Sequence, residues 1–497
     1  MLKRVLIANR GEIAIRIMRA CREIGIETVA VYSDADATAP HVTHADTAVC
    51  IGPPPSNESY LNIARLLDAA RSSGADAVHP GYGFLAENAA FARAVEQAGL
   101  IFVGPGADAI AAMGDKTLAR RAVAAAGVPV VPADEDPPRA GEPLAAAARR
   151  LGYPLLIKAV AGGGGKGMRI VRNQADLANA FGAAAREAGN AFGDDRLFLE
   201  RYVERPRHVE VQILADRHGS VVHLGERECS IQRRHQKIIE ETPSPAVDAT
   251  LRKQMTEAAV AVARSVSYRN AGTVEFLLDP NGKFYFLEMN TRLQVEHPIT
   301  EWVTGIDLVH AQLRIAAGER LRMRQKDIVA RGHAIECRIC AEDPAQQFLP
   351  SPGTIAHLRE PHGPGVRVDS GIAPGYAVPL QYDSLLSKLS VWDDTREAAR
   401  RRMIAALSDY TILGCTTVIP LLLDVLEHPS FARGDTHTHF LDDHFPKWTG
   451  RTHHLDVATI AAAIDLARPQ HTAPSAADQN APLSPWTTLG QWRIGTR

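Results

Sequence analysis

Two glutamates, Glu275 and Glu288, are the residues whose type and spacing first suggest chemistry. They lie in two runs rich in β-branched and aromatic residues, TVEFLL and KFYFLEM, which flank the turn signal DPNG at residues 279–282. A two-residue loop at 281–282 would place the glutamates directly opposite each other, and a four-residue loop would make them diagonal neighbours. Because side chains alternate along a strand, both alternatives put the two acids on one face of a β-hairpin.

Like charges on one face repel, and an ordinary cross-strand pair of this kind is destabilising by roughly 0.2–1 kcal/mol. A bridging divalent cation would reverse that sign, and oxygen ligands suit Mg²⁺ held together with nucleotide phosphates. If the chain stays extended, the same alternation continues through four polar residues: Asn290, Arg292, Gln294 and Glu296. The pattern predicts a face for a metal nucleotide and an anion. An exposed polar face with two unrelated acids is the alternative.

Two further stretches could hold anionic groups. YPLLIKAVAGGGGKGMRIV (153–171) predicts two strands around four glycines, and such a loop can close over phosphates through its backbone N–H groups. Lys158, at the end of the first strand, would add charge; a purely structural flexible loop is the alternative. The run QRRHQKI (232–238) would supply cations to anions held by the glutamates, although such runs are usually solvated faces.

Composition places the chain among ordinary globular proteins. It has 497 residues, 45% hydrophobic and 23% charged content, and a formal net charge of -2. We therefore expect no nucleic-acid partner and no membrane partner. The start MLKRVLIANRGEIAIRI lacks the features of a signal peptide, no window approaches a membrane span, and six scattered cysteines fit reduced thiols. These features predict a cytoplasmic location.

The rhythm of the elements predicts the fold class. Strands and helices alternate over roughly residues 1–105, which indicates a parallel, doubly wound α/β sheet. The proline-rich and acidic stretch 127–143 reads as a hinge into a second unit. From 331 onward, short strands with glycine and proline turns and two helices indicate an α+β unit. Past 447 the composition is that of a linker, and His437 and His439 are expected at the surface.

These motifs together resemble a biotin carboxylase of the ATP-grasp superfamily, in the order GGGGKGMRIV, QRRHQK, EFL with EMN, and NTRLQVEHPITE. ANRGEIAIRI, HPGYGFLAEN, RGHAIECRICAEDP and YDSLLSKL fit the same family. The resemblance implies an α/β domain at 1–114, an ATP-grasp domain at 115–333 with a mobile lid at about 131–203, a C-terminal α+β domain at 334–446, and a linker at 447–497 that leads into a following domain. It implies ATP-dependent carboxylation of biotin by bicarbonate through carboxyphosphate.

Such a reaction needs a base, clamps for oxyanions and screened phosphates. The resemblance implies Glu296 as the general base for bicarbonate. It places that anion among Lys237, Arg292, Gln294 and the backbone of Val295, with Arg338 stabilising the biotin enolate. It gives Mg²⁺ or Mn²⁺ to Glu275, Glu288 and Asn290. It places ATP among Lys116, Lys158, Gly164, Gly165, Glu200, Val203, His208, Gln232, His235 and Gln236, together with the two metal-binding glutamates.

The expected partners follow from the same resemblance. No Met-Lys-Met biotinylation motif is present, so biotin is expected on a carrier elsewhere, with a carboxyltransferase subunit downstream. A homodimer through the first helix is one expected assembly, although Pro364 stands where the family often has an aromatic residue. The ending SPWTTLGQWRIGTR resembles methylcrotonyl- and propionyl-CoA carboxylase α subunits. Acetyl-CoA or pyruvate carboxylase subunits, other ATP-grasp ligases and a non-catalytic nucleotide-binding protein are the alternatives.

Overall fold

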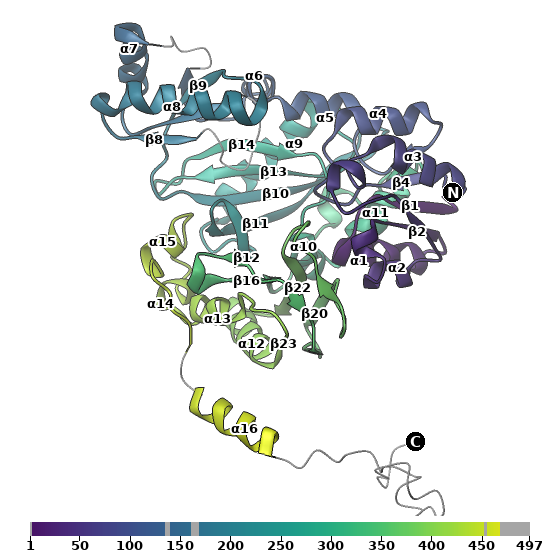
Figure 1. The fold of residues 1–497 in the computed structure, drawn as a ribbon. Helices are drawn as coiled ribbons and strands as arrows, with labels where there is room; N and C mark the ends of the chain where they lie inside the picture. Colours follow the sequence, from purple (N-terminus) through teal and green to yellow (C-terminus); the bar gives the residue numbers. More distant parts are fainter. Residues whose placement is uncertain (1, 135–139, 161–167, 452–454, 468–497) are drawn as a thin grey trace, which may run out of the picture. The chain divides into compact units, whose positions relative to one another are not determined.

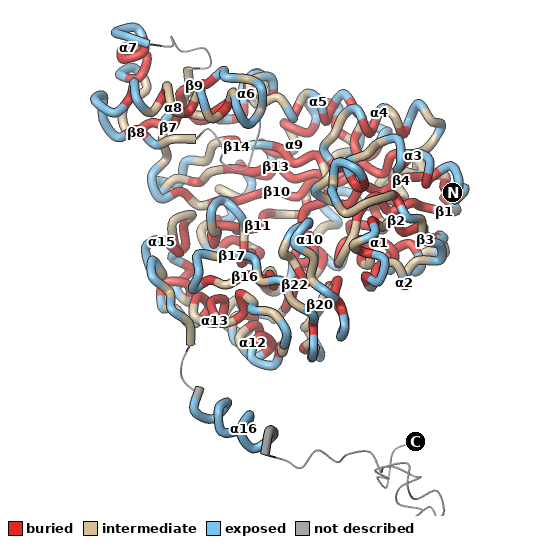
Figure 2. Tube along the Cα trace, in the orientation of Figure 1, coloured by how far each residue is buried: buried red, intermediate tan, exposed pale blue. Residues whose placement is uncertain are grey.

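The computed structural model describes residues 2–134, 140–160, 168–451 and 455–467. The chain divides into two compact units, Met1–Thr449 and Gly450–Arg497. The sheets formed by the described residues lie in the first unit, and the second contains the helix α16 (Leu455–Ala467), which is exposed over residues 456–464 (Figure 2). Among the described residues, no helix combines the length and the apolar character that crossing a membrane requires.

The N-terminal sheet is entirely parallel, in the order β3-β2-β1-β4-β5, as the alternating pattern predicts. Its strands β1, β2 and β4 are labelled in Figure 1. Its strands are β1 (Arg4–Ile7), β2 (Glu27–Tyr32), β3 (Thr47–Cys50), β4 (Ala77–His79) and β5 (Ile101–Phe102). Its helices are α1 (Gly11–Glu23), α2 (Pro40–His44), α3 (Ile63–Ser72), α4 (Ala89–Gln97) and α5 (Ala107–Gly114). Residues Val5 and Ile7 pack with α1, whereas Leu6 packs with α3 and α4, so both faces are covered.

A second, antiparallel sheet runs through the middle of the unit in the order β14-β13-β10-β11-β12-β15-β22-β20. Its strands are β10 (Arg207–Ala215), β11 (Val221–Arg233), β12 (Gln236–Thr242), β13 (Asn270–Leu278), β14 (Phe284–Asn290), β15 (His333–Cys340), β20 (Val366–Ser370) and β22 (Leu385–Asp393). The charged run QRRHQKI proves to be a tight hairpin between β11 and β12. Its turn residues Arg234 and His235 have φ values of 46° and 66°, as the common two-residue hairpin turns require.

A small four-stranded sheet, β6-β9-β7-β8, carries the segment predicted to be the lid. It consists of β6 (Ala133–Asp134), β7 (Leu155–Ala159), β8 (Arg169–Val171) and β9 (Leu197–Arg201), with the helices α7 (Gly141–Leu151) and α8 (Gln174–Phe192). The apolar side chains of both helices pack on the strands in one core. The glycine stretch between β7 and β8, including Gly164 and Gly165, lies outside the described residues.

The remaining helices support the large sheet. They are α6 (Lys116–Ala125), α9 (Ala249–Ser265), α10 (His297–Thr304), α11 (Leu308–Ala316), α12 (Arg396–Asp409), α13 (Ile419–Glu427), α14 (Pro429–Ala432) and α15 (Phe440–His444). The short strands are β16 (Glu342–Asp343), β17 (Leu349–Pro350), β18 (Gly353–Thr354), β19 (His357–Arg359), β21 (Ala377–Val378) and β23 (Thr411–Leu413).

The prediction of a surface position is wrong for His437, which is 3% exposed, and His439 is part-buried against Tyr202.

Alternation on β10 and β13 separates an apolar face from a polar one. Val209, Val211 and Ile213 pack in one core with residues of α9, so the residues between them must point the other way. Glu210 is one of these, and it lies directly opposite Glu275 of β13. The buried packing on one face therefore fixes which side chains reach the other.

Gly272 of β13 packs against a buried aromatic residue, Tyr268. A Cβ atom at this position would collide with the buried ring and hydroxyl group of Tyr268. We expect Gly272→Ala to lower the free energy of unfolding by about 1–3 kcal/mol, the usual cost of overpacking, as measured by urea denaturation. Gly114→Ala is the matched control, because nothing lies within 4 Å of a Cβ there. An equal loss in both variants would contradict the steric explanation.

Candidate active site

The predicted hairpin forms, and Glu275 lies directly opposite Glu288, as one of the two alternatives requires. Neither predicted loop length is correct, however, because Leu278 pairs with Phe284 and the loop spans residues 279–283. A β-bulge after the Phe276–Phe286 pair shifts the register and brings the two glutamates opposite each other. The bulge, which the sequence did not predict, restores the pairing that a shorter loop would have given.

The row of acids is longer than the sequence indicated. Glu210 faces Glu275, which faces Glu288, and Arg227 of β11 continues the row beyond Glu210. Arg227 donates from Nε to Oε1 of Glu210 at 2.6 Å. Neither Glu210 nor Arg227 was predicted from the sequence. An acid between valines in HVEVQILAD was the available signal, because a charge in an apolar strand is seldom buried without a partner.

Lys237 of β12 neutralises this row. Its ammonium nitrogen Nζ donates to three carboxylates: Oε2 of Glu210 at 2.5 Å, Oε1 of Glu275 at 2.8 Å and Oε1 of Glu296 at 2.7 Å. Burial alone would lower the pKa of Lys237, but the three carboxylates outweigh it and the pKa is raised well above the ordinary value. Lys237 is therefore a permanent cation at the centre of the site.

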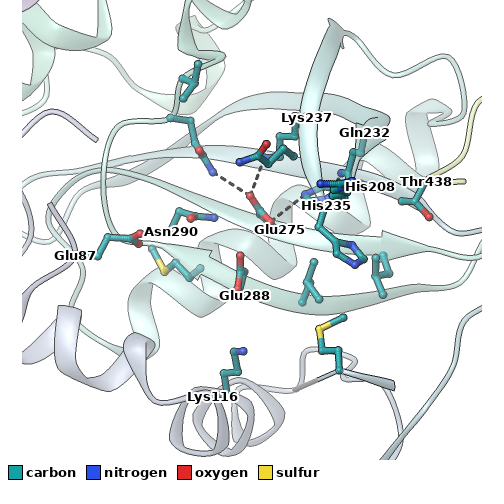
Figure 3. A pocket seen from close by; sticks show the side chains of 18 of the residues that line it. Glu87, Lys116, His208, Gln232, His235, Lys237, Glu275, Glu288, Asn290 and Thr438 are labelled. Carbon is teal, nitrogen blue, oxygen red and sulfur yellow. Dashed lines mark hydrogen bonds and ion pairs between the residues drawn. The ribbon is translucent and has the colours of Figure 1, made fainter. Parts of the chain in front are cut away.

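The charge state of Glu275 follows from its neighbours. Burial would raise its pKa, but Lys237 and His208 outweigh burial and the pKa is lowered. The ring nitrogen Nε2 of His208 lies 3.0 Å from Oε2 of Glu275 (Figure 3). Gln294 donates from Nε2 to Oε1 of Glu275 at 3.0 Å. The pKa of Glu288 is instead raised, by desolvation and by the charge of Glu275. A cation between the two carboxylates would favour the charged form of Glu288.

The chain does not stay extended after β14, so the condition for continued alternation is not met. The strand ends at Asn290, and Glu296 occupies the N-cap position of α10. The predicted polar residues nevertheless stay together through side-chain contacts. Arg292 donates from Nη2 to Oδ1 of Asn290 at 2.8 Å and from Nη1 to Oε1 of Gln294 at 2.9 Å.

Glu296 is fully buried behind two cations. Its Oε1 accepts from Lys237, and its Oε2 accepts from Nη2 of Arg338 at 3.0 Å. Burial would raise its pKa, yet Lys237, Arg338 and Arg227 together lower it well below the ordinary value. The carboxylate is therefore ionised and held in place by the groups predicted to bind the anion.

A cavity of about 1570 Å³ opens over these groups. The predicted residues that line it are Lys116, Lys158, Glu200, Val203, His208, Gln232, His235, Gln236, Lys237, Glu275, Glu288, Asn290, Arg292, Gln294, Val295 and Arg338. Lys116 points from α6 towards Glu288 (Figure 3). Lys158 on β7 pairs with Glu200 on β9, so the small sheet supplies one wall of the cavity.

The N-terminal unit contributes to the same cavity through the motif HPGYGFLAEN. Glu87 accepts from Nε of Arg292 at 2.8 Å, and its other oxygen accepts from the backbone of Thr291 at 3.0 Å. The sequence placed this motif at the carboxyl end of a strand, where open α/β sheets bind ligands. It did not single out Glu87, because the partner Arg292 lies 205 residues further along the chain.

Comparisons with known proteins define first the class of the chain. Family models match the biotin carboxylase N-terminal domain at 1–110, the ATP-binding domain of the carbamoyl-phosphate synthase L chain at 115–324, and the biotin carboxylase C-terminal domain at 336–443. The fold is that of biotin carboxylases, with a parallel N-terminal sheet and antiparallel sheets. The chain therefore has the domain content of an ATP-dependent ligase.

Individual relatives show which family the chain belongs to. Biotin carboxylase 1 of Bacillus subtilis is 53% identical over 443 residues, which are 89% of this chain and 98% of that protein. The mitochondrial propionyl-CoA carboxylase alpha chain of Sus scrofa is 50% identical over 445 residues, which are 89% of this chain and 61% of that protein. The biotin carboxylase domain dimer of Hydrogenobacter thermophilus 2-oxoglutarate carboxylase, solved with MgADP, ADP and bicarbonate, is 48% identical. It has a TM-score of 0.86 and covers 89% of this chain and 98% of that one. The chain belongs to the biotin carboxylase family.

Proposed function

We propose that this enzyme carboxylates biotin with bicarbonate at the expense of ATP. The observation that carries the proposal is the position of Glu296, which is ionised and held between Lys237 and Arg338 beside a cavity walled by acids and lysines. Glu296 removes the proton of bicarbonate, and Lys237 and Arg292 hold the resulting anion. The anion attacks the γ-phosphorus of ATP to give carboxyphosphate, with ADP as the leaving group. The phosphate group of carboxyphosphate then leaves and takes the ureido N–H proton of biotin, and the deprotonated nitrogen forms the new C–N bond with the carboxyl carbon.

The other roles follow from position. Gln294 and the backbone of Val295 complete the bicarbonate pocket, and Arg338 stabilises the anionic biotin with a permanent positive charge. Lys116 and Lys158 contact the phosphates from the opposite wall, together with Gly164 and Gly165. The remaining predicted residues surround the nucleoside: Glu200, Val203, His208, Gln232, His235 and Gln236. Each of these described residues lines the cavity.

The donor set fits a hard divalent cation. Glu275 and Glu288 offer carboxylate oxygens from paired positions on β13 and β14, and Asn290 offers an amide oxygen on the same face. Asn290 Oδ1 accepts from Nη2 of Arg292 at 2.8 Å, and a carbonyl oxygen has a second lone pair that could face a cation. Bound Mg²⁺, or Mn²⁺ in its place, would screen the charge of the ATP phosphates and polarise the bond that breaks.

Metal dependence provides a prediction at this point. We expect Glu288→Gln to raise the Mg²⁺ concentration required for half-maximal activity by about tenfold or more, because one of two charged ligands is lost. Titration of activity with Mg²⁺ at fixed ATP measures the shift. Glu257→Gln is the matched control, since this acid is exposed on α9 and pairs with Lys253 at 3.9 Å. An unchanged titration in Glu288→Gln would contradict the metal assignment.

One assay tests the proposed function as a whole. ADP release is measured with bicarbonate, in the presence and absence of free biotin. We expect release that depends on bicarbonate and rises with biotin. Release without any stimulation by biotin would indicate another ligase that uses bicarbonate and would overturn the proposal.

We further propose that the chain serves an acyl-CoA carboxylase of the methylcrotonyl- or propionyl-CoA type, with acetyl-CoA and pyruvate carboxylases as alternatives. The ending SPWTTLGQWRIGTR and the similarity to the propionyl-CoA carboxylase alpha chain support this assignment. The biotin would then be borne by a carrier domain, the product would pass to a carboxyltransferase subunit, and the enzyme would assemble as a homodimer. The division into domains at 1–114, 115–333, 334–446 and 447–497 stays part of the proposal.

A further inference from the structure

Arg338 is held by a second carboxylate that has no role in the reaction as proposed above. Glu240 of β12 is fully buried, and its Oε1 accepts from Nε of Arg338 at 2.6 Å. The guanidinium nitrogen Nη2 lies between this oxygen, at 2.6 Å, and Oε2 of Glu296, at 3.0 Å. Arg338 therefore touches the base on one side and Glu240 on the other.

The register of the large sheet fixes this arrangement. Glu240 of β12 lies directly opposite Glu336 of β15, and Arg338 follows Glu336 by two residues on the same face. Glu336 is fully buried, and neither of its carboxylate oxygens has a hydrogen-bond partner among the described residues. Its pKa is raised well above the ordinary value, chiefly by burial. Of this pair of acids, Glu240 is therefore the one whose carboxylate pairs with Arg338.

We propose that Glu240 is a positioning residue that acts through Arg338, orienting its guanidinium and setting the net charge around the bound anion. This inference rests on the proposed function. The ion pair occupies Nε and part of Nη2, and Nη1 stays available for the cavity that Arg338 lines. A single carboxylate acceptor fixes the plane of a guanidinium, which determines where the remaining donors point.

The charge on Glu240 also opposes the cations of the site. The titratable groups that face it are Lys237 on its own strand, Cys229 on β11, Glu336 and Arg338 on β15, and Glu296 at the start of α10. Burial raises the pKa of Glu240 to about 7, although Arg338 opposes this rise. Glutamine imitates the protonated carboxyl group and preserves an acceptor oxygen for Arg338. Replacement by glutamine thus removes the charge while leaving most of the geometry in place.

The test compares Glu240→Gln with Glu241→Gln. Glu241 is the next residue, equally buried, and paired with His333 and Arg396, outside the cavity lining. Steady-state rates are measured between pH 6 and 9 with MgATP, bicarbonate and free biotin. The loss of one negative charge near the anion should lower the KM for bicarbonate by roughly 3- to 10-fold and weaken Glu296 as a base, which lowers kcat by about tenfold. Both effects should fade below about pH 7, where Glu240 of the unaltered enzyme takes up a proton.

Glu241→Gln should change neither constant in this pattern, whatever its effect on stability. Equal kinetics in Glu240→Gln and Glu241→Gln, or effects independent of pH, would overturn the role of Glu240. If Glu240→Gln does not fold, Glu240→Asp provides the decisive measurement. This variant keeps the charge but shortens its reach, so kcat should fall with the KM for bicarbonate unchanged or raised, and a lowered KM would overturn the inference. Absence of biotin-stimulated turnover in the unaltered enzyme would instead overturn the proposed function.

Discussion

Replacement of Glu296 by alanine is expected to reduce turnover by roughly 100- to 10,000-fold, the range for removal of a general base, while ATP binding is retained. The carboxylate is fully buried behind Lys237 and Arg338, and its contacts are with these cations and Cys229. ATP contacts are expected on the opposite wall, at Lys116 and Lys158. Biotin-stimulated ADP release measures the loss, and calorimetry with MgATP measures binding.

The matched control for this variant is Glu301→Ala on the same helix, α10. Glu301 is also a buried acid, and it accepts from Arg16 at 2.8 Å and from Arg367 at 2.7 Å. We expect this variant to be less stable but to keep Glu296, the proposed general base. Lost ATP binding in Glu296→Ala, with ATP binding preserved in the control, would show that Glu296 organises the nucleotide site and would contradict its role as base.

Replacement of Lys237 by methionine is expected to abolish activity and also to destabilise the fold by about 3–5 kcal/mol, the usual cost of removing one partner from a buried ion pair. Methionine matches the length of the lysine chain but leaves Glu210, Glu275 and Glu296 without their shared cation. Urea denaturation at pH 7 measures the loss. Arg227 and Arg338 would still compensate part of the negative charge.

The carboxyl groups determine how the free energy of unfolding changes with pH. In the unaltered enzyme, Glu275 and Glu296 have lowered pKa values in the folded state, so they contribute stability above their unfolded pKa and lose it as the pH falls. Burial raises the pKa of both carboxyl groups and Lys237 lowers it, so both pKa values rise when Lys237 is removed. The destabilisation by Lys237→Met should therefore be largest near pH 7 and shrink towards pH 4, where the carboxyl groups take up protons.

An exposed lysine supplies the control for this substitution. The side chain of Lys253 on α9 is 76% exposed, and its ion pair with Glu257 spans 3.9 Å. Lys253→Met should change the free energy of unfolding by less than about 0.5 kcal/mol at any pH in this range. A pH-independent loss in Lys237→Met would show that lost packing, rather than the carboxylates, causes the destabilisation.

The hairpin shows which features local sequence patterns could predict and which they could not. Alternation in TVEFLL and KFYFLEM predicted the two strands and the shared face of Glu275 and Glu288, because the side-chain period of a strand is a local property. The loop length was wrong, since the five-residue loop and the bulge act together and neither has a clear local signature. The turn Arg234-His235 was missed for a similar reason, because both residues adopt positive φ values that glycine or asparagine more often supplies.

The sequence by itself determined the class of chemistry: the acids, the glycine-rich stretch and the basic run, and through their order the family. The tertiary structure alone decided which of these groups touch. Lys237 and Glu296 are 59 residues apart, and Arg338 is 42 residues beyond Glu296, yet all three meet because β12 lies beside β15 and α10 begins next to both. Strand order depends on packing across the whole sheet, which no local period encodes. For the same reason, the places of Glu210 and Glu240 in the site could be recognised only from the register of neighbouring strands.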